Sequence, residues 1–262
     1  MKRRFSWTVF LVQTGLVALF LAGWEIAART KTLDPFYVSS PARIARHVGV
    51  WLDEGILFKH LWITLSEAAV GLIAGMLLGL AFGFLFAASR KIDAVLQPFI
   101  GVMNALPRIA FAPLIILWFG FGFLSKVVIV VSLVFFVVFF NTYQGFKDVN
   151  PVLLKNARVL GASPYHVIRH IYLPATMTWI FASLRLSVGY AVIAAIIGEY
   201  IGASAGIGFL IDNAQAMFDS TGVMAGLAVL TATVAVIDYA VRSIECHFAK
   251  WKLHPNSIGG KS

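Results

Sequence analysis

A single arginine stands inside one of the long apolar stretches of this sequence, between two prolines. Arg108 follows Pro107 and precedes Pro113 in a run without other charged residues. If this run crosses a membrane, a charge within it is costly and usually has a partner or a function. Arg108 could attract an anionic solute, or it could donate hydrogen bonds to carbonyls that the prolines leave without donors. The sequence leaves both interpretations open.

Other charged residues within apolar stretches include Arg185, Glu199 and Asp238. Asp238 could pair with Arg242, one helical turn later, or with Arg185 in another stretch. Glu199 stands near the end of its stretch, directly before the glycine-rich residues 202–208. Those residues could form a re-entrant turn, a gate or an exposed loop.

The sequence predicts no metal site, cofactor or catalytic group for the chain itself. His166 and His170 have the i,i+4 spacing of a metal-binding pair, but no third ligand accompanies them. The last residues, Gly259-Gly260-Lys261-Ser262, resemble part of a phosphate-binding loop. Such a loop needs glycine where Pro255 stands and a helix after the Lys-Ser pair. We therefore expect no ATP hydrolysis by this chain.

The composition is that of an integral membrane protein. Of the 262 residues, 60% are hydrophobic and only 13% are charged, whereas soluble domains have about a quarter charged residues. Predominantly apolar stretches of about 20 residues predict membrane-spanning helices. Six such stretches occur, so we expect an all-α integral membrane protein with about six transmembrane helices at roughly 7–28, 62–88, 95–119, 126–146, 175–200 and 221–243.

Lysine and arginine in the loops predict the orientation of these spans. With the N-terminus in the cytoplasm, thirteen loop or terminal cations fall inside and six, including Lys126, fall outside. Both termini and the segment 147–174 are then cytoplasmic, in a multi-pass membrane protein. The net charge of +9 is thereby explained by the membrane face, and no nucleic acid partner is expected.

Glycine and proline predict how the spans pack. Gly71, Gly75, Gly79 and Gly83 recur every four residues and present a smooth face for another helix, within the chain or in a second copy. The prolines around Arg108 predict irregular backbone, which is tolerated at membrane depth only beside protein or water. The predicted translocation-path residues are Asn104, Pro107, Arg108, Pro113 and Glu199.

Outside the spans, residues 40–52 form an amphipathic pattern. Ile44, Val48, Trp51 and Leu52 fall on one side of a helix. This segment is predicted to lie along the outer membrane surface, with contact to a binding protein as the alternative.

The segment between the fourth and fifth stretches is polar and sharply punctuated, and it reads as two short helices. Asn150 can cap the first, with Pro151 in its first turn. Gly161 suits the left-handed position that ends it. Ser163-Pro164 repeats the cap and proline, and Pro174 is expected to end the second helix. A stiff, doubly capped segment between membrane spans suits docking by another protein, although an ordinary loop is the alternative.

The spacing from Gly161 to Ile171-x-Leu173-Pro174 resembles the EAA loop of permease subunits of bacterial ABC importers. The family consensus begins Glu-Ala-Ala, whereas Lys155, Asn156 and Ala157 stand here, so a base replaces the signature acid. The residues of this chain that correspond to the loop are Lys155, Asn156, Ala157, Arg158, Leu160, Gly161, Ala162, Ser163, Pro164, Ile171, Leu173 and Pro174.

Two further stretches extend the resemblance to roughly residues 60–250. Residues 106–120 look like the third span of the nitrate/sulfonate/taurine branch of these permeases, and residues 197–210 look like the stretch after its fifth span. The resemblance implies a type I ABC importer permease fold. We expect an N-terminal helix with an outer amphipathic segment (1–60), a permease core (61–250) with the coupling loop 147–174, and a cytoplasmic tail (251–262).

The resemblance also implies the partners. Two copies of the chain would form the pore in membrane lipid, a dimer of cytoplasmic ATP-binding subunits would bind ATP and Mg²⁺ and drive transport, and a periplasmic solute-binding protein would deliver the solute. The solute would be a sulfonate, taurine or a nitrate-like anion, with a pyrimidine vitamin precursor or riboflavin as the alternative. A secondary transporter is a third possibility, but such folds tend to carry internal repeats and intramembrane acid clusters, and neither is evident.

Overall fold

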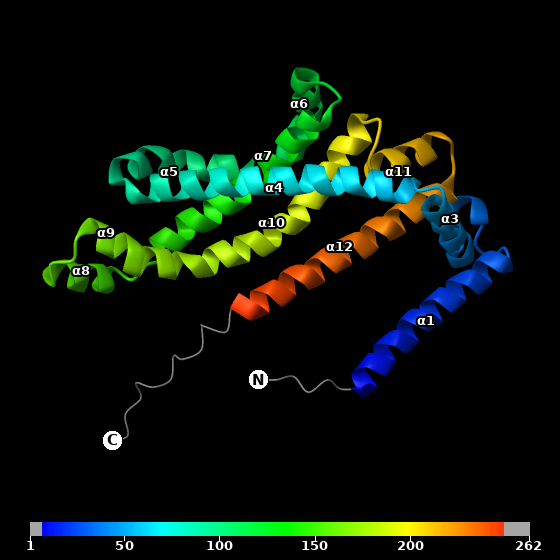
Figure 1. Cartoon of the computed structure of the whole chain (residues 1–262), viewed down its shortest axis with the longest axis horizontal. Coiled ribbons are helices and arrows are strands. Elements are labelled where there is room, and N and C mark those ends of the chain that lie inside the picture. Colours follow the sequence, from blue (N-terminus) through cyan, green and yellow to red (C-terminus); the bar gives the residue numbers. More distant parts are fainter. Residues whose placement is uncertain (1–6, 249–262) are drawn as a thin grey trace. The chain divides into compact units, whose positions relative to one another are not determined.

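The computed structural model describes residues 7–248, and within this range it consists of helices and their connections (Figure 1). The described residues divide into two compact units: residues 7–63 with 205–231, and residues 64–204 with 232–248. Residues 205–231 group with the N-terminal part through contacts such as the 2.9 Å hydrogen bond between Ser39 Oγ and Thr221 Oγ1. The expected tail 251–262, including the Pro255 to Ser262 run, lies outside the described residues.

The first unit contains an N-terminal span and a set of short helices. Its elements are α1 (Trp7–Arg29), α2 (Pro35–Val38), α3 (Pro41–Asp53), the first turns of α4 (Ile56–Ala88), α11 (Ile207–Ala216) and the first part of α12 (Ser220–Phe248). Proline starts both α2 and α3, where its missing N–H costs nothing. The side chains of Asp34 and Ser40 cap them by accepting hydrogen bonds from backbone amides.

The amphipathic segment predicted at 40–52 is the helix α3. Ile44 and Trp51 are buried and Val48 is half-buried, as the pattern indicates, whereas Leu52 is exposed. The Glu25 carboxylate accepts a hydrogen bond from the Ala42 amide at 3.0 Å and so ties α3 to the end of α1.

The sequence does not predict α11. The glycine-rich residues do not form one loop, because α10 ends at Gly202 and a new helix begins at Ile207. Gly206, with φ +116°, makes the turn, and its N–H donates to His60 Nδ1 at 2.9 Å. Ile207 and Ile211 are buried, so packing rather than length makes this ten-residue helix stable.

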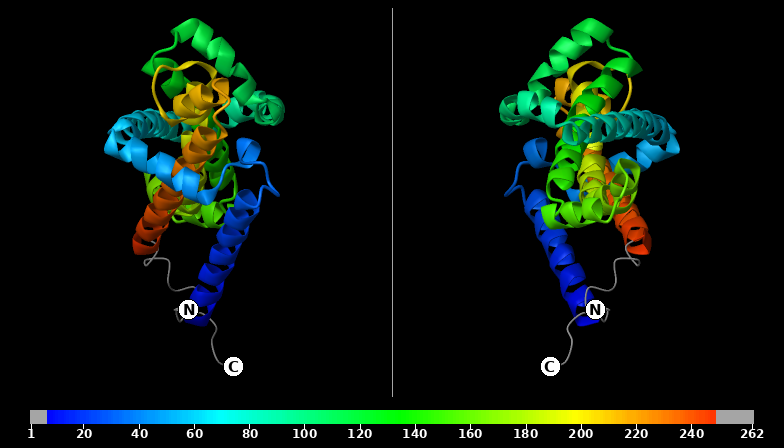
Figure 2. Two further views of the ribbon diagram at one scale, coloured as in Figure 1. Left: turned by 90° about the vertical axis from the view of Figure 1, so that its right-hand side faces the viewer. Right: turned by 90° about the vertical axis from the view of Figure 1, so that its left-hand side faces the viewer.

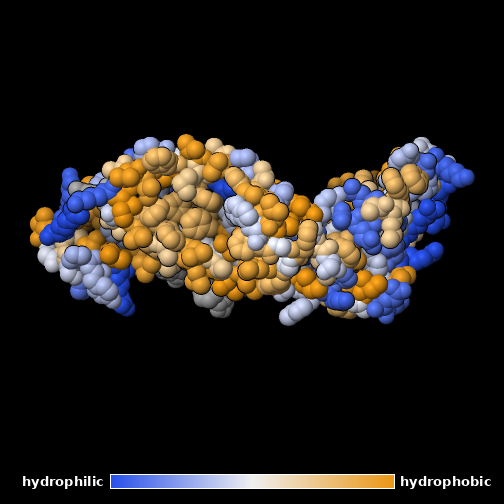
Figure 3. Space-filling model, turned by 90° about the horizontal axis from the view of Figure 1, so that it is seen from above, coloured by the Kyte–Doolittle hydropathy of each residue, from blue (hydrophilic) through white to orange (hydrophobic). Residues whose placement is uncertain are grey.

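The second unit carries most of the spans. Besides the rest of α4 and α12, its elements are α5 (Arg90–Ala105), η1 (Arg108–Phe111), α6 (Ala112–Phe119), α7 (Phe123–Lys147), α8 (Pro151–Val159), α9 (Pro164–Val167), η2 (Ile168–Tyr172) and α10 (Leu173–Gly202). Five helices of the described part are long and apolar enough to cross a membrane, and a bent pair makes a sixth if it counts as one span. Side chains such as Leu77, Leu117 and Trp118 are exposed, and wide areas of the face in Figure 3 are hydrophobic, as lipid-facing helices require.

The expected third span, 95–119, is not one straight helix. Residues Lys91–Ala105 and Arg108–Phe119 meet at 81°, and Figure 2 shows this change of direction in both views. Leu106 has extended backbone because it precedes Pro107, and Pro113 lies in the first turn of α6. Pro98, by contrast, lies inside α5 without ending it. The prolines therefore break the span at one place rather than three.

The glycine line of α4 packs against α7 within the chain. A Cβ atom at Gly71, Gly75 or Gly83 would lie 2.4–2.8 Å from the Cβ of Val130, Val134 or Thr142. At Gly79 it would lie 2.8 Å from the backbone oxygen of Phe135. Only glycine permits this approach, so the intrachain packing alternative is confirmed.

The core of this unit lies where α7 packs along α10. Small residues of α10, Ala191, Ala194 and Ala195, are almost completely buried against branched residues of α7 such as Val130 and Val134. Small against branched side chains allows close contact between the two backbones, which is how helices associate in lipid. These two helices form the frame to which the polar segment and the buried charges described below are attached.

Candidate functional site

The polar segment between α7 and α10 begins with a capped helix, as predicted. Asn150 Oδ1 accepts from the Val152 amide at 2.8 Å, and Pro151 occupies the first turn of α8. Gly161 has φ +78°, a conformation that favours glycine. The Ala162 amide donates to the Ala157 carbonyl at 2.9 Å and the Gly161 amide to the Arg158 carbonyl at 3.0 Å. This paired pattern is a Schellman motif, which fixes the direction in which the chain leaves α8.

The second short helix starts as predicted, but it does not end at Pro174. Ser163 caps α9 and Pro164 lies in its first turn. The helix then runs through a π-helical turn, η2, directly into α10, so residues 164–202 form one span. The Leu173 amide bonds to the carbonyl of Ile168, five residues back. Because the π turn shifts the hydrogen-bond register, the helix accommodates Pro174, which has no N–H to donate.

Apolar side chains gather on the exposed part of this segment. Val159 and Leu160, at the end of α8, are each 86% exposed, and Val152 and Leu153 at its start are more than half exposed. Lys155, Asn156 and Arg158 are exposed between them, while Ala157 and Ala162 are half-buried. A short polar helix that exposes apolar residues at both ends suits contact with another protein. The predicted coupling-loop residues include Leu160 but not Val152, Leu153 or Val159. These three could have been selected because they are apolar residues in a segment too short to span a membrane.

Aromatic packing anchors the segment to α7. The rings of Phe146 and Tyr172 stack with centroids 3.7 Å apart. The indole of Trp179 lies against Gly145, where a Cβ atom would come within 2.7 Å of the ring. On the other side of this end of α7, Asp93 of α5 accepts hydrogen bonds from Tyr143 and Lys147. These anchoring residues carry no local sequence signal, because their roles arise from contacts between separate helices.

The remaining residues of the predicted set lie around the second helix. Pro164, Leu173 and Pro174 are exposed and Ile171 is half-buried. The stacked rings of His166 and His170 lie 5.6 Å apart, with Ser163 Oγ 2.8 Å from His166 Nδ1. Arg169 donates to the Tyr165 hydroxyl at 2.8 Å. The two histidines are therefore engaged within their own helix.

The bend between α5 and α6 holds four of the five predicted translocation-path residues: Asn104, Pro107, Arg108 and Pro113. The Arg108 guanidinium donates to the carbonyls of Met103 at 2.8 Å and Asn104 at 3.1 Å, and it lies 4.5 Å from the centroid of the Phe136 ring. These contacts favour the interpretation that Arg108 satisfies carbonyls freed by the break. Glu199 lies elsewhere, buried on α10, where Thr64 of α4 donates to it at 2.7 Å.

The structure also decides the partner of Asp238 and corrects the predicted position of Lys126. Asp238 pairs with Arg185 across α12 and α10, at 3.9 Å between Oδ1 and Nε, beside a cavity of about 140 Å³. Lys126, counted among the outside loop cations, is instead a buried residue of α7 and only 1% exposed. The predicted span begins at Lys126, which was therefore counted with the preceding loop, whereas α7 begins three residues earlier, at Phe123.

Comparison with known proteins agrees with this architecture. Residues 71–251 match the family described as the inner membrane component of binding-protein-dependent transport systems. SsuC of Bacillus subtilis, named for aliphatic sulfonates transport, is 31% identical over 251 residues, which cover 96% of this chain and 90% of SsuC. ThiX of Halalkalibacterium halodurans, a formylaminopyrimidine transport permease, is 30% identical over 252 residues, 96% of this chain and 99% of ThiX.

A solved structure shows the same fold. An inward-facing conformation of the MetNI methionine ABC transporter superposes with a TM-score of 0.63 at 18% identity, over 73% of this chain and 95% of that chain. The helical order, the capped segment before α10 and the family match over most of the chain point the same way. The chain belongs to the inner membrane components of binding-protein-dependent transport systems, the transmembrane permeases of ABC importers.

Proposed function

We propose that residues 147–174 are the element through which a cytoplasmic ATP-binding subunit drives this permease. The observation that carries this proposal is a rigid segment with an exposed apolar surface. Both short helices are capped, Gly161 fixes the angle between them, and Val159 and Leu160 are 86% exposed. Exposure of these apolar side chains to water is unfavourable, so their burial against a partner protein would stabilise a complex.

The anchoring contacts explain how motion of that surface would reach the spans. The segment continues without interruption into α10, and the stack between Phe146 and Tyr172 holds it to α7. Movement of the ATP-binding subunits would therefore shift two core helices together rather than a loop. In this scheme the ATP-binding subunits hold ATP and Mg²⁺, and the permease supplies an element with two arrangements whose balance they change.

The proposed assembly is two copies of the chain, a dimer of ATP-binding subunits and a periplasmic solute-binding protein. Both termini and the segment 147–174 would face the cytoplasm, which the distribution of loop lysines and arginines supports. Reporter fusions at Asn150 and Asp34 test this orientation. A cytoplasmic signal at Asn150 with a periplasmic signal at Asp34 is expected, and the reverse pattern would refute it.

The proposed solute is a small organic sulfonate or a related anion. The relative SsuC, which matches nearly the full chain, supports this class. The relative ThiX supports a pyrimidine vitamin precursor as the second candidate, at almost equal identity. Arg108 does not decide between them, because its guanidinium already bonds two backbone carbonyls.

Reconstitution in proteoliposomes tests both parts of the proposal. The permease would be combined with the ATP-binding subunit that copurifies with it and with its solute-binding protein, and uptake of labelled alkanesulfonate, taurine, formylaminopyrimidine and riboflavin would be compared. ATP-dependent uptake of the sulfonates alone is expected. Uptake of the pyrimidine alone would reject the sulfonate assignment, and uptake that needs an ion gradient but no ATP would reject the importer mechanism.

A further inference from the structure

Three charged side chains are buried together inside the spans of the second unit. Glu67 is 3% exposed, and Glu199 and Lys126 are each 1% exposed. They come from three different helices, α4, α10 and α7. Ionisable residues at such places are rare and are retained only with close partners. None of them belongs to the segment 147–174 or to the bend at Pro107.

The contacts within this group are specific. Thr64 Oγ1 donates to Glu199 Oε1 at 2.7 Å, and Glu67 lies one helical turn after Thr64, on the same face of α4. The second oxygen of Glu67, Oε2, is buried and has no hydrogen-bond partner. The Lys126 ammonium donates to the carbonyl of Phe121 and, at 2.7 Å, to that of Gly202.

Two buried carboxyl groups on facing helices have one chemical requirement. Ionised carboxylates have acceptors only and repel each other, so the pair can share a hydrogen bond only if one group carries a proton to donate. Two ionised carboxylates beside one ammonium would also leave an uncompensated charge in a buried, water-poor site, which is strongly unfavourable. One bound proton removes both difficulties, since the charges of Lys126, one carboxylate and one neutral acid sum to zero.

The partners identify which group holds the proton. Glu199 accepts from the Thr64 hydroxyl, as the ionised group should, because charged oxygens need the most hydrogen bonds. Glu67 has an oxygen without a partner, which is much less costly for the carbonyl oxygen of a neutral acid than for a carboxylate. We propose that Glu67 and Glu199 form a proton-binding site in the membrane, with the proton on Glu67 and the negative charge on Glu199 beside Lys126.

The bound proton would act as a positioning element. Gly202 is the last residue of α10, and Phe121 lies in the turn before α7. Lys126 joins these two backbones, while the carboxyl pair joins α10 to α4. Close packing limits any rearrangement, because a Cβ atom at Gly198 would already lie 3.1 Å from both Lys126 and Ile129. The group therefore fixes three helices at one end of the unit.

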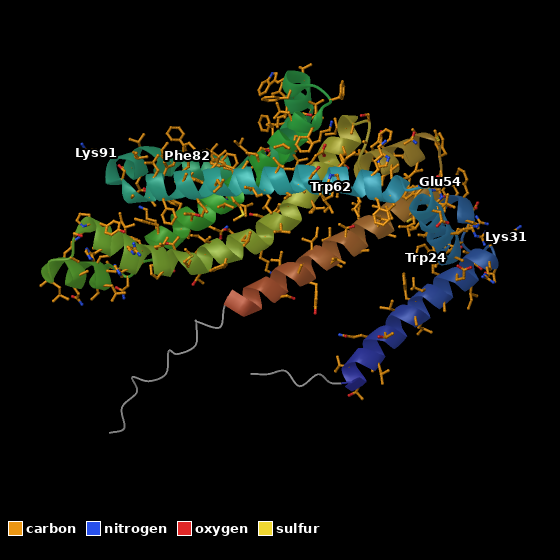
Figure 4. The ribbon with its side chains drawn as sticks, in the orientation of Figure 1. Trp24, Lys31, Glu54, Trp62, Phe82 and Lys91 are labelled. Carbon is orange, nitrogen blue, oxygen red and sulfur yellow. The ribbon has the colours of Figure 1, made fainter. Side chains whose placement is uncertain are left out.

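Infrared spectroscopy of the permease, purified with its partner subunits in lipid nanodiscs at neutral pH, tests the protonation directly. The difference spectrum between wild type and Glu67→Gln should show loss of the carbonyl band of one protonated carboxylic acid. Glu54→Gln is the matched control, because Glu54 is exposed (labelled in Figure 4) and should contribute no such band. If the Glu67→Gln spectrum equals that of the control, the proposed site is wrong.

Stability measurements supply the second arm. A glutamine amide can donate to Glu199 as a neutral acid does, so Glu67→Gln should assemble and melt close to the wild-type temperature. Glu67→Gln with Glu199→Gln leaves Lys126 without a negative partner and should melt clearly lower than Glu67→Gln alone. A Glu67→Gln chain that fails to assemble, or a double variant as stable as the single one, would contradict the charge balance. Neither readout depends on the transported solute or on the segment 147–174.

Discussion

The rings of Phe146 and Tyr172 lie almost parallel, inclined by 6° with centroids 3.7 Å apart, and this stack joins the end of α7 to the beginning of the helix that continues as α10. Phe146 is buried and Tyr172 is half-buried, so the contact is protected from solvent. The backbone oxygen of Tyr172 also accepts from Thr176 Oγ1 at 2.7 Å, which holds the π turn in place. The stack joins the exposed apolar surface of α8 and α9 to α7, in addition to the direct continuation of the helix into α10.

Loss of this stack should uncouple ATP hydrolysis from transport. We expect Tyr172→Ala to assemble with the ATP-binding subunit, since the stacked pair contributes only about 0.5–1.5 kcal/mol beyond its buried area. Solute uptake per ATP hydrolysed should fall severalfold. Tyr172→Phe keeps the ring and is the control. Equal uptake per ATP in Tyr172→Ala and wild type would show that the stack has no part in coupling.

Gly161 should tolerate asparagine much better than valine. Its φ of +78° disfavours residues with a Cβ atom by about 1–2 kcal/mol, most of all β-branched ones. No other group lies within 4 Å of a Cβ atom at this position, so the effect is one of backbone conformation and not of collision. Gly161→Val should reduce copurification of the ATP-binding subunit, and Gly161→Asn should largely preserve it. Similar losses in both variants would point to a steric contact in the complex instead.

Lys155 reports on the charge of the partner surface. It is exposed on α8, at the position where the resemblance to the EAA loop predicts an acid. If the partner presents an acidic group there, Lys155→Glu should weaken binding of the ATP-binding subunit more than Lys155→Ala does, because a like-charge contact replaces an attraction. The measurement is the affinity of the ATP-binding subunit at low and at high salt. Equal affinities of the two variants would indicate that the apolar residues Val159 and Leu160, and not the charge at residue 155, make the contact.

Arg108→Gln should lower stability whatever the solute. The change removes the guanidinium donors to the Met103 and Asn104 carbonyls and the contact with Phe136, and a carbonyl that loses its donor at membrane depth costs about 1–3 kcal/mol. Thermal unfolding in detergent measures this loss. Arg108→Lys, which keeps the charge but not the planar fork, should be intermediate. Normal stability with selective loss of uptake of an anionic solute would instead assign Arg108 to solute binding.

Gly79→Ala should disturb the packing of α4 on α7. The new Cβ atom would lie 2.8 Å from the carbonyl oxygen of Phe135, and backbone cannot move aside as a flexible side chain can. We expect a destabilisation of about 1–3 kcal/mol, typical of overpacking. Gly101→Ala in α5 is the control, because no group lies within 4 Å of its Cβ position. Equal melting temperatures for the two variants would contradict this helix interface.

The sequence predicts the parts of this fold that local chemistry determines. Asn150, Ser163 and Gly161 cap and end their helices as expected because the signals lie within a few residues of each other. The four-residue spacing of glycines in α4 likewise predicts a close helix contact, although only the structure identifies α7 as the partner. Apolar length predicts the spans, but not the 81° bend at Pro107, because a proline can kink or break a helix with the same sequence signature.

The contacts that join separate helices could not be predicted. Glu67 is an acid within an apolar stretch, which alone could have marked it as a candidate, but its place near Glu199 depends on how α4 lies beside α10. The contact of Lys126 with the Gly202 carbonyl, 76 residues away in the sequence, likewise depends on how α7 lies beside α10. Pro174 was expected to end a helix because proline usually does so. The π turn that lets the helix continue past it has no recognisable local sequence pattern.

The π turn at Ile168–Tyr172 has a mechanical consequence. Since it allows the helix to pass Pro174 unbroken, the exposed surface of α9 and the buried carboxylate of Glu199 belong to one rod of 39 residues. At 1.5 Å per residue such a rod is about 60 Å long. A tilt of about 5° around its middle would displace each end by about 2.5 Å, in opposite directions. A small displacement of α9 by a nucleotide-binding partner would thus move the residues near Glu199, at the other end of the same helix, by a similar distance in the opposite direction.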